Sequence, residues 1–226
     1  MPQYFITSSG TNIGKTFVTT ALIAAARARS IEAAAYKPLL SGFTLDQIVE
    51  SDAGQLLCAL ARDVTFEHLD EISPWRYHAP LAPHMAARLE GQEVPLAPII
   101  AWCKTRLLKP APLTLIEGVG GVMAPITAHE TVRDWMEALG LPCVLVVGSY
   151  LGAMSHALTA LEALAAKNLT VSALVISDSG ESSIGLHETA SELRAFVPAS
   201  IPCYTLPRAL HFADAEVGAL LAHLMR

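Results

Sequence analysis

The chain has 226 residues, of which 52% are hydrophobic and 16% are charged, and its formal net charge at pH 7 is −6. This composition excludes an intrinsically disordered chain and suits a folded protein with a large buried core. The negative charge argues against nucleic acid or an anionic membrane surface as the main partner, although a small anionic ligand needs only a local positive site.

Short apolar runs alternate with longer helical patterns along the chain, which is typical of βαβ units around a parallel sheet. The expected strands span residues 4–7, 33–37, 113–117, 143–148, 171–177 and 201–205. The expected helices span residues 15–30, 51–62, 95–108, 131–140, 153–167, 186–196 and 213–225. Thr131 and Asp134 have the spacing of a capping box at the start of one of these helices.

Residues 70–95, rich in proline and aromatic side chains, fit this alternation poorly and are expected to cover one end of the sheet. We predict a single α/β domain over residues 1–226, with a doubly wound, mostly parallel sheet. Such sheets bind ligands at the carboxyl ends of their strands, so residues at those ends are the first candidates for function.

A loop of small residues joins the first strand to the first helix, with the sequence Ser8-Ser9-Gly10-Thr11-Asn12-Ile13-Gly14-Lys15-Thr16. Backbone N–H groups of such a loop, together with the helix N-terminus, form a cradle for phosphate. Lys15 is expected to reach the β- and γ-phosphates of a nucleoside triphosphate, and the Thr16 hydroxyl to bind Mg²⁺. Ser9 stands where the phosphate-loop pattern usually has its first glycine. The alternative is an ordinary glycine turn before a helix, but the position of the loop favours phosphate binding.

Charged residues follow two other expected strands. Lys37 ends the second strand, where its ammonium could stabilise charge that develops in phosphoryl transfer, or could simply extend to solvent. Glu117 ends the third strand, where a carboxylate of the Walker B type holds Mg²⁺; the alternative is a carboxylate that caps the glycine turn after it. Asp52 is ambiguous, because Ser51 or Asp52 could cap the helix that follows.

Taken together, these motifs resemble the dethiobiotin synthetase family of P-loop NTPases. The shared segments are Thr-Asn-Ile-Gly-Lys-Thr (11–16), Tyr-Lys-Pro-Leu-Leu-Ser-Gly (36–42), Glu-Ser-Asp-Ala (50–53), Ala-Pro-Leu-Ala-Pro-His (79–84), Ile-Glu-Gly-Val-Gly-Gly (116–121) and Val-Leu-Val-Val-Gly (144–148). They occur in the family's order over about the first two-thirds of the chain, and the last third matches mainly by its strand–helix pattern.

The resemblance implies an enzyme of biotin biosynthesis that converts 7,8-diaminopelargonate (7,8-diaminononanoate), CO₂ or bicarbonate, and ATP to dethiobiotin, ADP and phosphate, with Mg²⁺. One substrate amine takes up CO₂ as a carbamate, which attacks the γ-phosphate to give a mixed carbamic–phosphoric anhydride. The second amine then displaces phosphate and closes the ring. A carbamate needs fixed positive charge and exclusion of water more than a general base.

The resemblance also assigns residues to roles. The implied catalytic residues are Thr11, Lys15 and Lys37, and the implied Mg²⁺ ligands are Thr16, Asp52 and Glu117. Ser41 would contact the substrate. The other implied nucleotide-binding positions are Asn12, Ile13, Gly14, Phe17, Gly118, Val119, Gly120, Ser177, Asp178, Pro207, Arg208, Ala209 and Asp214.

In this family the substrate carboxylate docks at a helix N-terminus that the other subunit of a homodimer supplies. The matching residues are Gly152, Ala153, Met154 and Ser155, where free backbone N–H groups would receive an anion. A homodimer is therefore expected. At the base, the family has Asn-Asp after the fifth strand, whereas this chain has Ser177-Asp178. A serine cannot form the donor–acceptor fork of an amide, so weaker base selectivity, or contacts from the backbone near residues 207–209, is expected.

Two other P-loop classes are the alternatives: a partitioning-type ATPase switch and a corrin-type amide synthetase. The first typically has an extra lysine early in the phosphate loop and often an amphipathic membrane helix at its C-terminus, whereas residues 8–12 contain no lysine and residues 211–226 are not basic. The second needs a glutaminase domain for which 226 residues are too few. The spacing of the four cysteines and the N-terminal sequence suggest reduced thiols in a cytoplasmic protein.

Overall fold

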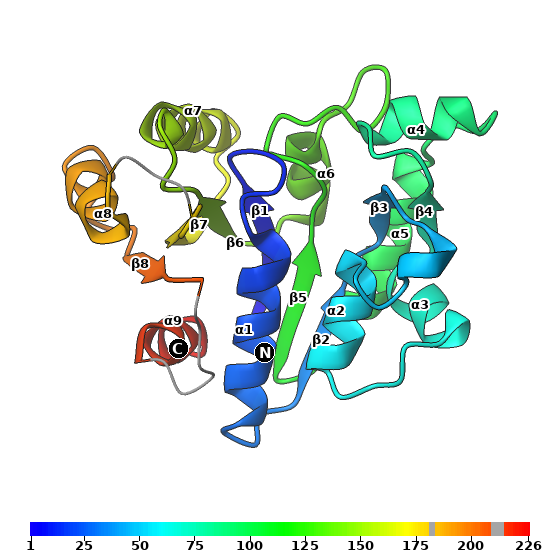
Figure 1. The fold of residues 1–226 in the computed structure, drawn as a ribbon, viewed down its shortest axis with the longest axis horizontal. Coiled ribbons are helices and arrows are strands. Elements are labelled where there is room, and N and C mark those ends of the chain that lie inside the picture. Colours follow the sequence, from blue (N-terminus) through cyan, green and yellow to red (C-terminus); the bar gives the residue numbers. More distant parts are fainter. Residues whose placement is uncertain (181–183, 209–214) are drawn as a thin grey trace.

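The computed structural model describes residues 1–180, 184–208 and 215–226. A parallel sheet of six strands lies at its centre, in the order β2-β5-β1-β6-β7-β8 (Figure 1). The strands are β1 (Gln3–Ser8), β2 (Ala33–Tyr36), β5 (Leu113–Glu117), β6 (Cys143–Val147), β7 (Val171–Ser177) and β8 (Cys203–Leu206). Because every pairing in this sheet is parallel, the carboxyl ends of all six strands lie at the same edge.

The sheet is covered on both faces, and the strand β6 shows why its sequence is apolar throughout. All five of its residues are buried. Leu145 and Val147 belong to the core on one face, and Val144 and Val146 belong to the core on the other. A strand with both faces covered reads as a continuous apolar run instead of an alternating one.

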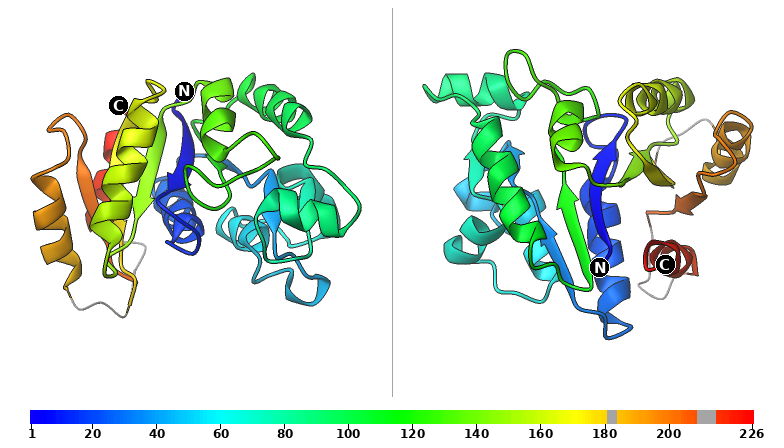
Figure 2. Two further views of the ribbon diagram at one scale, coloured as in Figure 1. Left: turned by 90° about the horizontal axis from the view of Figure 1, so that it is seen from above. Right: turned by 180° about the vertical axis from the view of Figure 1, so that it is seen from behind.

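Helices form a layer on each face of the sheet, and Figure 2 shows α1 and α6 on opposite sides of the strands. One core contains buried residues of α1 (Lys15–Arg27), α2 (Asp52–Ala59), α3 (Phe66–Ile72) and α9 (Ala215–Leu224). The other contains buried residues of α4 (Pro83–Leu89), α5 (Leu96–Leu107), α6 (Val132–Leu139), α7 (Ala153–Ala165) and α8 (Leu186–Arg194). The doubly wound α/β fold predicted from the sequence is confirmed.

Each expected strand and helix of the main sheet is present, with ends that differ by a few residues. The first helix ends at Arg27 and not at residue 30, because Ser30 has a left-handed backbone, with φ of 57°. The last strand begins at Cys203, two residues later than expected. The predicted capping box forms, with the Thr131 backbone N–H donating to Asp134 Oδ2 at 2.7 Å. In the described part of the chain, none of the helices is long and apolar enough to cross a membrane.

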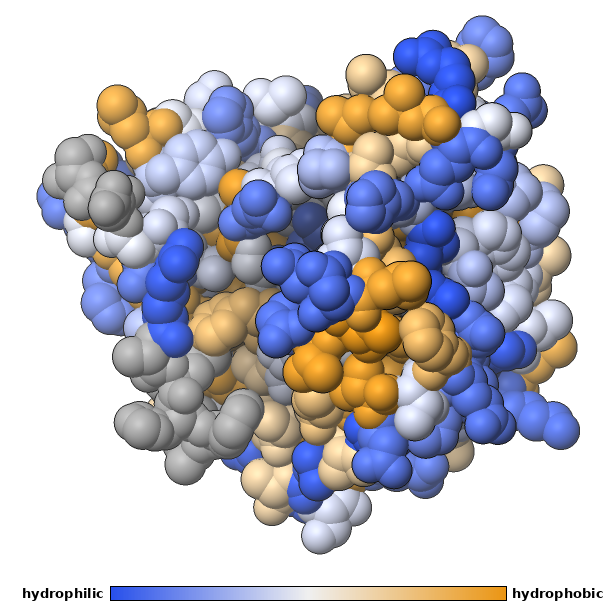
Figure 3. Space-filling model, turned by 45° about the vertical axis from the view of Figure 1, so that its right-hand side comes forward, coloured by the Kyte–Doolittle hydropathy of each residue, from blue (hydrophilic) through white to orange (hydrophobic). Residues whose placement is uncertain are grey.

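Residues 39–90 hold elements that the sequence pattern did not predict. A second sheet pairs β3 (Leu39–Ser41) with β4 (Trp75–Tyr77) in parallel, and α3, α4 and a 3₁₀ turn, η1 (Leu45–Gln47), surround it. Figure 1 places these elements beside β2, the edge strand of the main sheet. In Figure 3, apolar side chains gather in patches between hydrophilic ones; the exposed large apolar residues of this region are Leu45, Val49, Phe66, Leu81, Met85 and Leu89.

Candidate active site

A cavity of about 310 Å³ opens at the carboxyl edge of the main sheet. It is lined by Thr11, Asn12, Gly14, Lys15, Thr16, Lys37, Leu40, Ser41, Asp52, Val119 and Gly120. These residues come from the β1–α1 loop, the segment after β2, the start of α2 and the loop after β5. The parallel topology therefore brings together residues that are far apart in the sequence.

The phosphate loop depends on one glycine for its shape. Gly14 has φ of 110°, which side-chain-bearing residues rarely adopt, and it immediately precedes α1. A Cβ atom at this position would lie 2.6 Å from the Ser177 Oγ atom. A side chain at residue 14 would therefore both collide with Ser177 at the end of β7 and strain the backbone of the loop.

Lys15 is buried and all its hydrogen-bonding partners in the structure come from glycine-rich loops and β1. Its Nζ atom donates to Gly120 O at 2.7 Å, to Ser8 Oγ at 3.0 Å and to Gly10 O at 3.4 Å. Burial, and then the nearby charge of Lys37, lowers the pKa of Lys15 to about 8. The loop thus holds its cation at a site where an anion would be strongly attracted.

Lys37 is even more deeply enclosed, with a relative exposure of 1%. Its Nζ atom lies 2.8 Å from Glu117 Oε1 and 3.0 Å from Asp52 Oδ2, and it donates to Gly118 O at 2.7 Å. Burial opposes the charge on Lys37, but the carboxylates of Glu117 and Asp52 outweigh it and hold the pKa of the ammonium above its usual value. The alternative that Lys37 extends to solvent is wrong.

Glu117 has a relative exposure of 0% and does not line the cavity. Its Oε1 atom accepts from Lys37 Nζ and from Thr16 Oγ1, each at 2.8 Å, and its Oε2 atom accepts from Thr19 Oγ1 at 2.7 Å. The carboxylate therefore lies behind Lys37 and Thr16, both of which do line the cavity.

The ambiguity at the start of α2 is resolved by the hydrogen bonds. Ser51 is the N-cap, because its Oγ atom accepts from the Gly54 backbone N–H at 3.1 Å. Asp52 is left to pair with Lys37, and this ammonium is the main reason that the pKa of Asp52 is lowered. The helix thus presents a carboxylate to the cavity.

The donor set suits a nucleotide-bound magnesium ion. Mg²⁺ prefers oxygen ligands and is usually held by one or two carboxylates together with substrate phosphates. Thr16 and Asp52 line the cavity, and Glu117 lies within hydrogen-bonding distance of Thr16. In the described residues no group of three or more His, Cys, Asp or Glu residues has a metal-binding arrangement. The oxygens of Thr16 and Asp52 fit an ion that also takes ligands from phosphate, and the Glu117 carboxylate lies behind them in contact with Thr16.

A second pocket, of about 280 Å³, adjoins the first and shares Asn12 and Gly14 with it. It is lined by Asn12, Ile13, Gly14, Phe17, Ser177, Asp178 and Arg208. Arg208 is fixed there, because its Nε atom donates to Asp178 O at 3.0 Å and its Nη2 atom donates to Ser179 O at 3.1 Å. Pro207 precedes it in the chain, whereas the predicted positions Ala209 and Asp214 lie outside the described residues. The shape and position of this pocket suit the nucleoside of a bound triphosphate.

The residues expected to receive a substrate carboxylate lie apart from the cavity in this chain. Gly152 precedes α7 with φ of 91°, and no side chain caps the helix start. Gly152, Ala153, Met154 and Ser155 do not line the cavity that contains Lys37. Their assignment stays a prediction that needs a second subunit.

Two residues at the site were missed by the sequence analysis. Ser8 contributes its hydroxyl to Lys15, and this hydroxyl also donates toward Gly10 O at 2.6 Å and Gly120 O at 3.0 Å. Thr19 contributes the hydrogen bond to Glu117. Thr19 lies one helical turn beyond Lys15 and Thr16 on α1, which places it on the same face of the helix but does not reveal its contact with Glu117.

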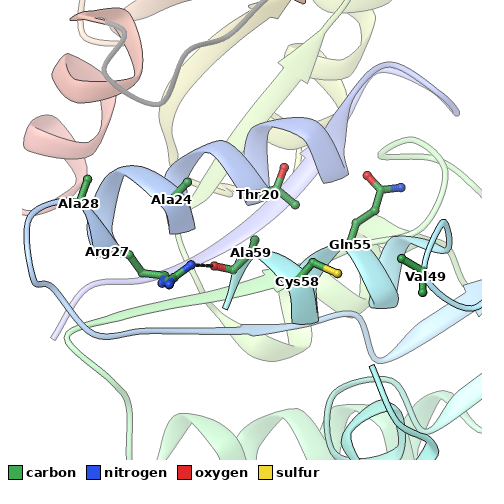
Figure 4. A pocket seen from close by; sticks show the side chains of 8 residues that line it. All are labelled: Thr20, Ala24, Arg27, Ala28, Val49, Gln55, Cys58 and Ala59. Carbon is green, nitrogen blue, oxygen red and sulfur yellow. Dashed lines mark hydrogen bonds between the residues drawn. The ribbon is translucent and has the colours of Figure 1, made fainter. Parts of the chain in front are cut away.

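A larger groove, of about 760 Å³, runs between α1 and α2 (Figure 4). Its lining residues are Thr20, Ala24, Arg27, Ala28, Val49, Gln55, Cys58 and Ala59. Arg27 supplies the charge in this groove, and its Nη1 atom donates to Ala59 O at 2.9 Å. The groove has no convergent acids and bases, so the smaller cavity at the strand ends is the site with the chemistry.

Comparison with known proteins agrees with this geometry. A family model described as an AAA domain matches residues 2–205. ATP-dependent dethiobiotin synthetase BioD of Phenylobacterium zucineum is 47% identical over 225 residues, covering 98% of this chain and 96% of that protein. The protein of the same name from Pseudomonas paraeruginosa is 36% identical over 228 residues, covering 99% and 96%.

Solved structures with low sequence identity show the same fold. The hydrogenase maturation factor HypB of Archaeoglobus fulgidus has a TM-score of 0.56 and 12% identity, covering 98% of this chain and 88% of that chain. A ParA family ATPase of Chlorobium tepidum has a TM-score of 0.56 and 14% identity, covering 99% and 100%. The fold is thus that of the P-loop NTPases, and by its sequence relatives the chain belongs to the dethiobiotin synthetase family.

Proposed function

We propose that this chain is an ATP-dependent dethiobiotin synthetase that carboxylates 7,8-diaminopelargonate with CO₂ and closes its ureido ring. The observation that carries the proposal is the convergence of two ammonium groups and two carboxylates at one cavity, three of them in its lining and the Glu117 carboxylate directly behind Lys37 and Thr16. Lys15 and Lys37 supply the cations, and Asp52 and Glu117 supply the acids. Four separate segments deliver these groups, and phosphoryl transfer depends on charged groups positioned in this way around the phosphates.

The reaction divides into three steps whose charges these residues can meet. A substrate amine adds to CO₂ and loses a proton, which leaves a carbamate. A carbamate oxygen attacks the γ-phosphorus of ATP, the bond to the β-phosphate oxygen breaks, and ADP leaves. The second amine then attacks the carbamoyl carbon, phosphate leaves, and the ring closes with loss of a proton.

The two lysines have different parts in this sequence. Lys15 lies on the phosphate loop, where its ammonium can contact the β- and γ-phosphates and stabilise their negative charge. Lys37 keeps its charge because Asp52 and Glu117 surround it, so it can stabilise the carbamate and the transferring phosphoryl group without itself giving up a proton. The cavity thus supplies fixed positive charge at both ends of the new bond.

The remaining assignments belong to the same proposal. Thr16, Asp52 and Glu117 would hold Mg²⁺, which when bound neutralises charge on the transferring phosphoryl group. Ser41 lines the cavity beside Lys37 and would contact the diamine. In a homodimer, the start of α7 at Gly152 would present its backbone N–H groups to the substrate carboxylate of the other subunit.

A product assay tests the proposal directly. Purified chain is incubated with ATP, Mg²⁺, bicarbonate and the diamine, and dethiobiotin is measured together with ADP. We expect one dethiobiotin for each ADP, and ATP hydrolysis that depends on the diamine. Hydrolysis that DNA or lipid vesicles stimulate, with no dethiobiotin formed, would instead favour an ATPase switch and contradict the proposal.

A further inference from the structure

The Glu117 carboxylate is held by three donors that come from different parts of the site. Lys37 and Thr16 both donate to Oε1, at 2.8 Å each. Thr19 donates to Oε2 at 2.7 Å. Glu117 and Thr19 both have a relative exposure of 0%, so the contact between these two side chains is closed to solvent.

The hydroxyl of Thr19 has two acceptors within reach but only one hydrogen. A threonine inside a helix commonly donates to the carbonyl one turn earlier, and here Lys15 O lies 2.9 Å from Thr19 Oγ1. The distance to Glu117 Oε2 is shorter, at 2.7 Å. A carboxylate paired with an ammonium is also the stronger acceptor, so the geometry favours the bond to Glu117.

This contact decides which way the carboxylate faces. Oε1 meets both Lys37 and Thr16, the two residues through which Glu117 touches the cavity lining. Any ligand that draws the Thr16 hydroxyl away leaves Lys37 and Thr19 to hold the carboxylate. Without a donor on Oε2, the carboxylate could rotate about its Cγ–Cδ bond, and of the three partners of Lys37 Nζ only Asp52 and Gly118 O would stay in place.

We propose that Thr19 is a positioning residue of this site, which acts through Glu117 to fix Lys37 and the oxygen ligands of a nucleotide-bound Mg²⁺. This inference rests on the proposed function for its kinetic consequence, but its geometric basis is independent of the substrate. Thr19 does not line the cavity, so it has no direct contact to offer a ligand.

The chain offers a matched control in the next residue. Thr20 is on the same helix, and its hydroxyl donates to Phe17 O at 3.0 Å, but its side chain lines the groove between α1 and α2 (Figure 4). Thr19→Val and Thr20→Val therefore remove the same group from the same helix. They differ in whether Glu117 loses a partner.

The experiment measures ATP affinity by equilibrium titration, with Mg²⁺ and again with EDTA, and kcat for dethiobiotin formation. For Thr19→Val we expect the ratio of the ATP affinity with Mg²⁺ to the ATP affinity in EDTA to fall about tenfold. We expect a similar loss in kcat, as is usual when a hydrogen-bonding partner of a metal ligand is removed. Affinity in EDTA should change little. Thr19→Ser, which keeps the hydroxyl, and Thr20→Val should both resemble the wild type.

The results of these variants decide whether the Thr19 hydroxyl positions Glu117. Equal behaviour of Thr19→Val and Thr20→Val would overturn the proposal, as would a folded Thr19→Ser variant that shows the same loss as Thr19→Val. If Thr19→Val does not fold, Thr19→Ala removes the hydroxyl in its place, and its comparison with Thr19→Ser tests the hydroxyl. If the wild type makes no dethiobiotin, the proposed function fails, while the Mg²⁺-dependent affinity still tests Thr19.

Discussion

Lys37 and Glu117 form an ion pair hidden from solvent, with 2.8 Å between Nζ and Oε1. The two residues are 80 positions apart in the sequence; Glu117 ends β5, and Lys37 directly follows β2, the neighbouring strand. Burying two charges in this way is expensive, and such a pair contributes little net stability compared with apolar residues of the same size. Its value here is chemical, because it keeps a charged ammonium at the wall of the cavity.

Removing the ammonium should abolish catalysis more completely than binding. For Lys37→Met we expect no measurable dethiobiotin formation, while the dissociation constant for ATP changes little, because Lys15 and the loop backbone still hold the phosphates. Turnover by stopped assay and nucleotide affinity by titration measure the two effects separately. A variant that loses ATP binding but keeps residual turnover would contradict this division of roles.

The same substitution should also lower stability, since it leaves the Glu117 carboxylate buried without its main partner. Breaking a buried pair in this way typically costs about 3 to 5 kcal/mol. Urea unfolding of Lys37→Met measures this cost. The double variant Lys37→Met/Glu117→Gln should recover much of the stability and none of the activity, because it removes the unpaired charge but not the chemical defect.

The sequence predicted the main sheet and the principal site residues because both follow from local patterns. Strands buried on both faces read as apolar runs, and parallel topology brings the residues that follow them to one edge. That reasoning was enough to expect Lys15, Lys37 and Glu117 near one another. It could not decide whether Asp52 or Ser51 caps α2, because either side chain can accept from the first turn of a helix.

Other features were beyond sequence patterns for physical reasons. The strands β3 and β4 have three residues each, too few to show a period of two. The hydroxyl of Thr19 can always bond within its own helix, so no spacing reveals that it reaches Glu117. Ser8 reads as an ordinary residue at the end of a strand, and only the folded loop shows its oxygen beside Lys15.

The conformation of the phosphate loop gives a second prediction. Gly14→Ala would place a methyl group 2.6 Å from Ser177 Oγ and force alanine into a backbone with φ of 110°. We expect a loss of about 1 to 3 kcal/mol in stability, as for other strained backbones, together with a large loss of ATP affinity. Thermal unfolding and nucleotide titration provide the two readings.

Gly140 is a suitable control for this change. It also has positive φ, of 66°, and an added Cβ would meet nothing within 4 Å. Gly140→Ala should therefore show the backbone strain alone, with ATP affinity unchanged. If Gly14→Ala binds ATP as well as Gly140→Ala does, close approach of residue 14 to Ser177 is not needed for the site.

The acidity of Lys15 predicts how nucleotide affinity depends on pH. Burial and the charge of Lys37 lower the pKa of Lys15 to about 8, while Glu117 and Asp52 act in the opposite direction. Below this pH the empty site holds an ammonium; above it the amine is neutral, and binding of a triphosphate must take up a proton. Affinity for ATP should therefore fall as the pH rises through about 8.

Titration of ATP affinity between neutral and alkaline pH measures this midpoint. In Lys37→Met the midpoint should move to higher pH, because the repulsive neighbour is gone while the carboxylates remain. Lys15→Arg should remove the transition, since an arginine stays charged throughout this range. A midpoint that is the same in the wild type and in Lys15→Arg would show that another group titrates.

The nucleoside pocket predicts weak discrimination between bases. Ser177 offers one hydroxyl, whose oxygen faces the phosphate loop near Gly14, and the Asp178 Oδ1 atom already accepts from the Gly180 backbone N–H at 2.9 Å. Arg208 can only donate, and two of its N–H groups are used on backbone carbonyls. Residue 177 therefore offers no side-chain amide to donate and accept at one base edge, and the Asn12 amide lines the pocket where it adjoins the phosphate cavity.

A site discriminates strongly between bases when the wrong base would leave polar groups of the site without hydrogen-bonding partners, which gives discrimination on the order of 10⁴ or more. We expect kcat/KM for GTP and CTP to lie within about a hundredfold of the value for ATP, as for pockets that select mainly by shape. Ser177→Asn should increase the preference for ATP, because an amide both donates and accepts. A strong ATP preference in the wild type would place base recognition on groups other than Ser177, and Ser177→Asn would then change the ratio little.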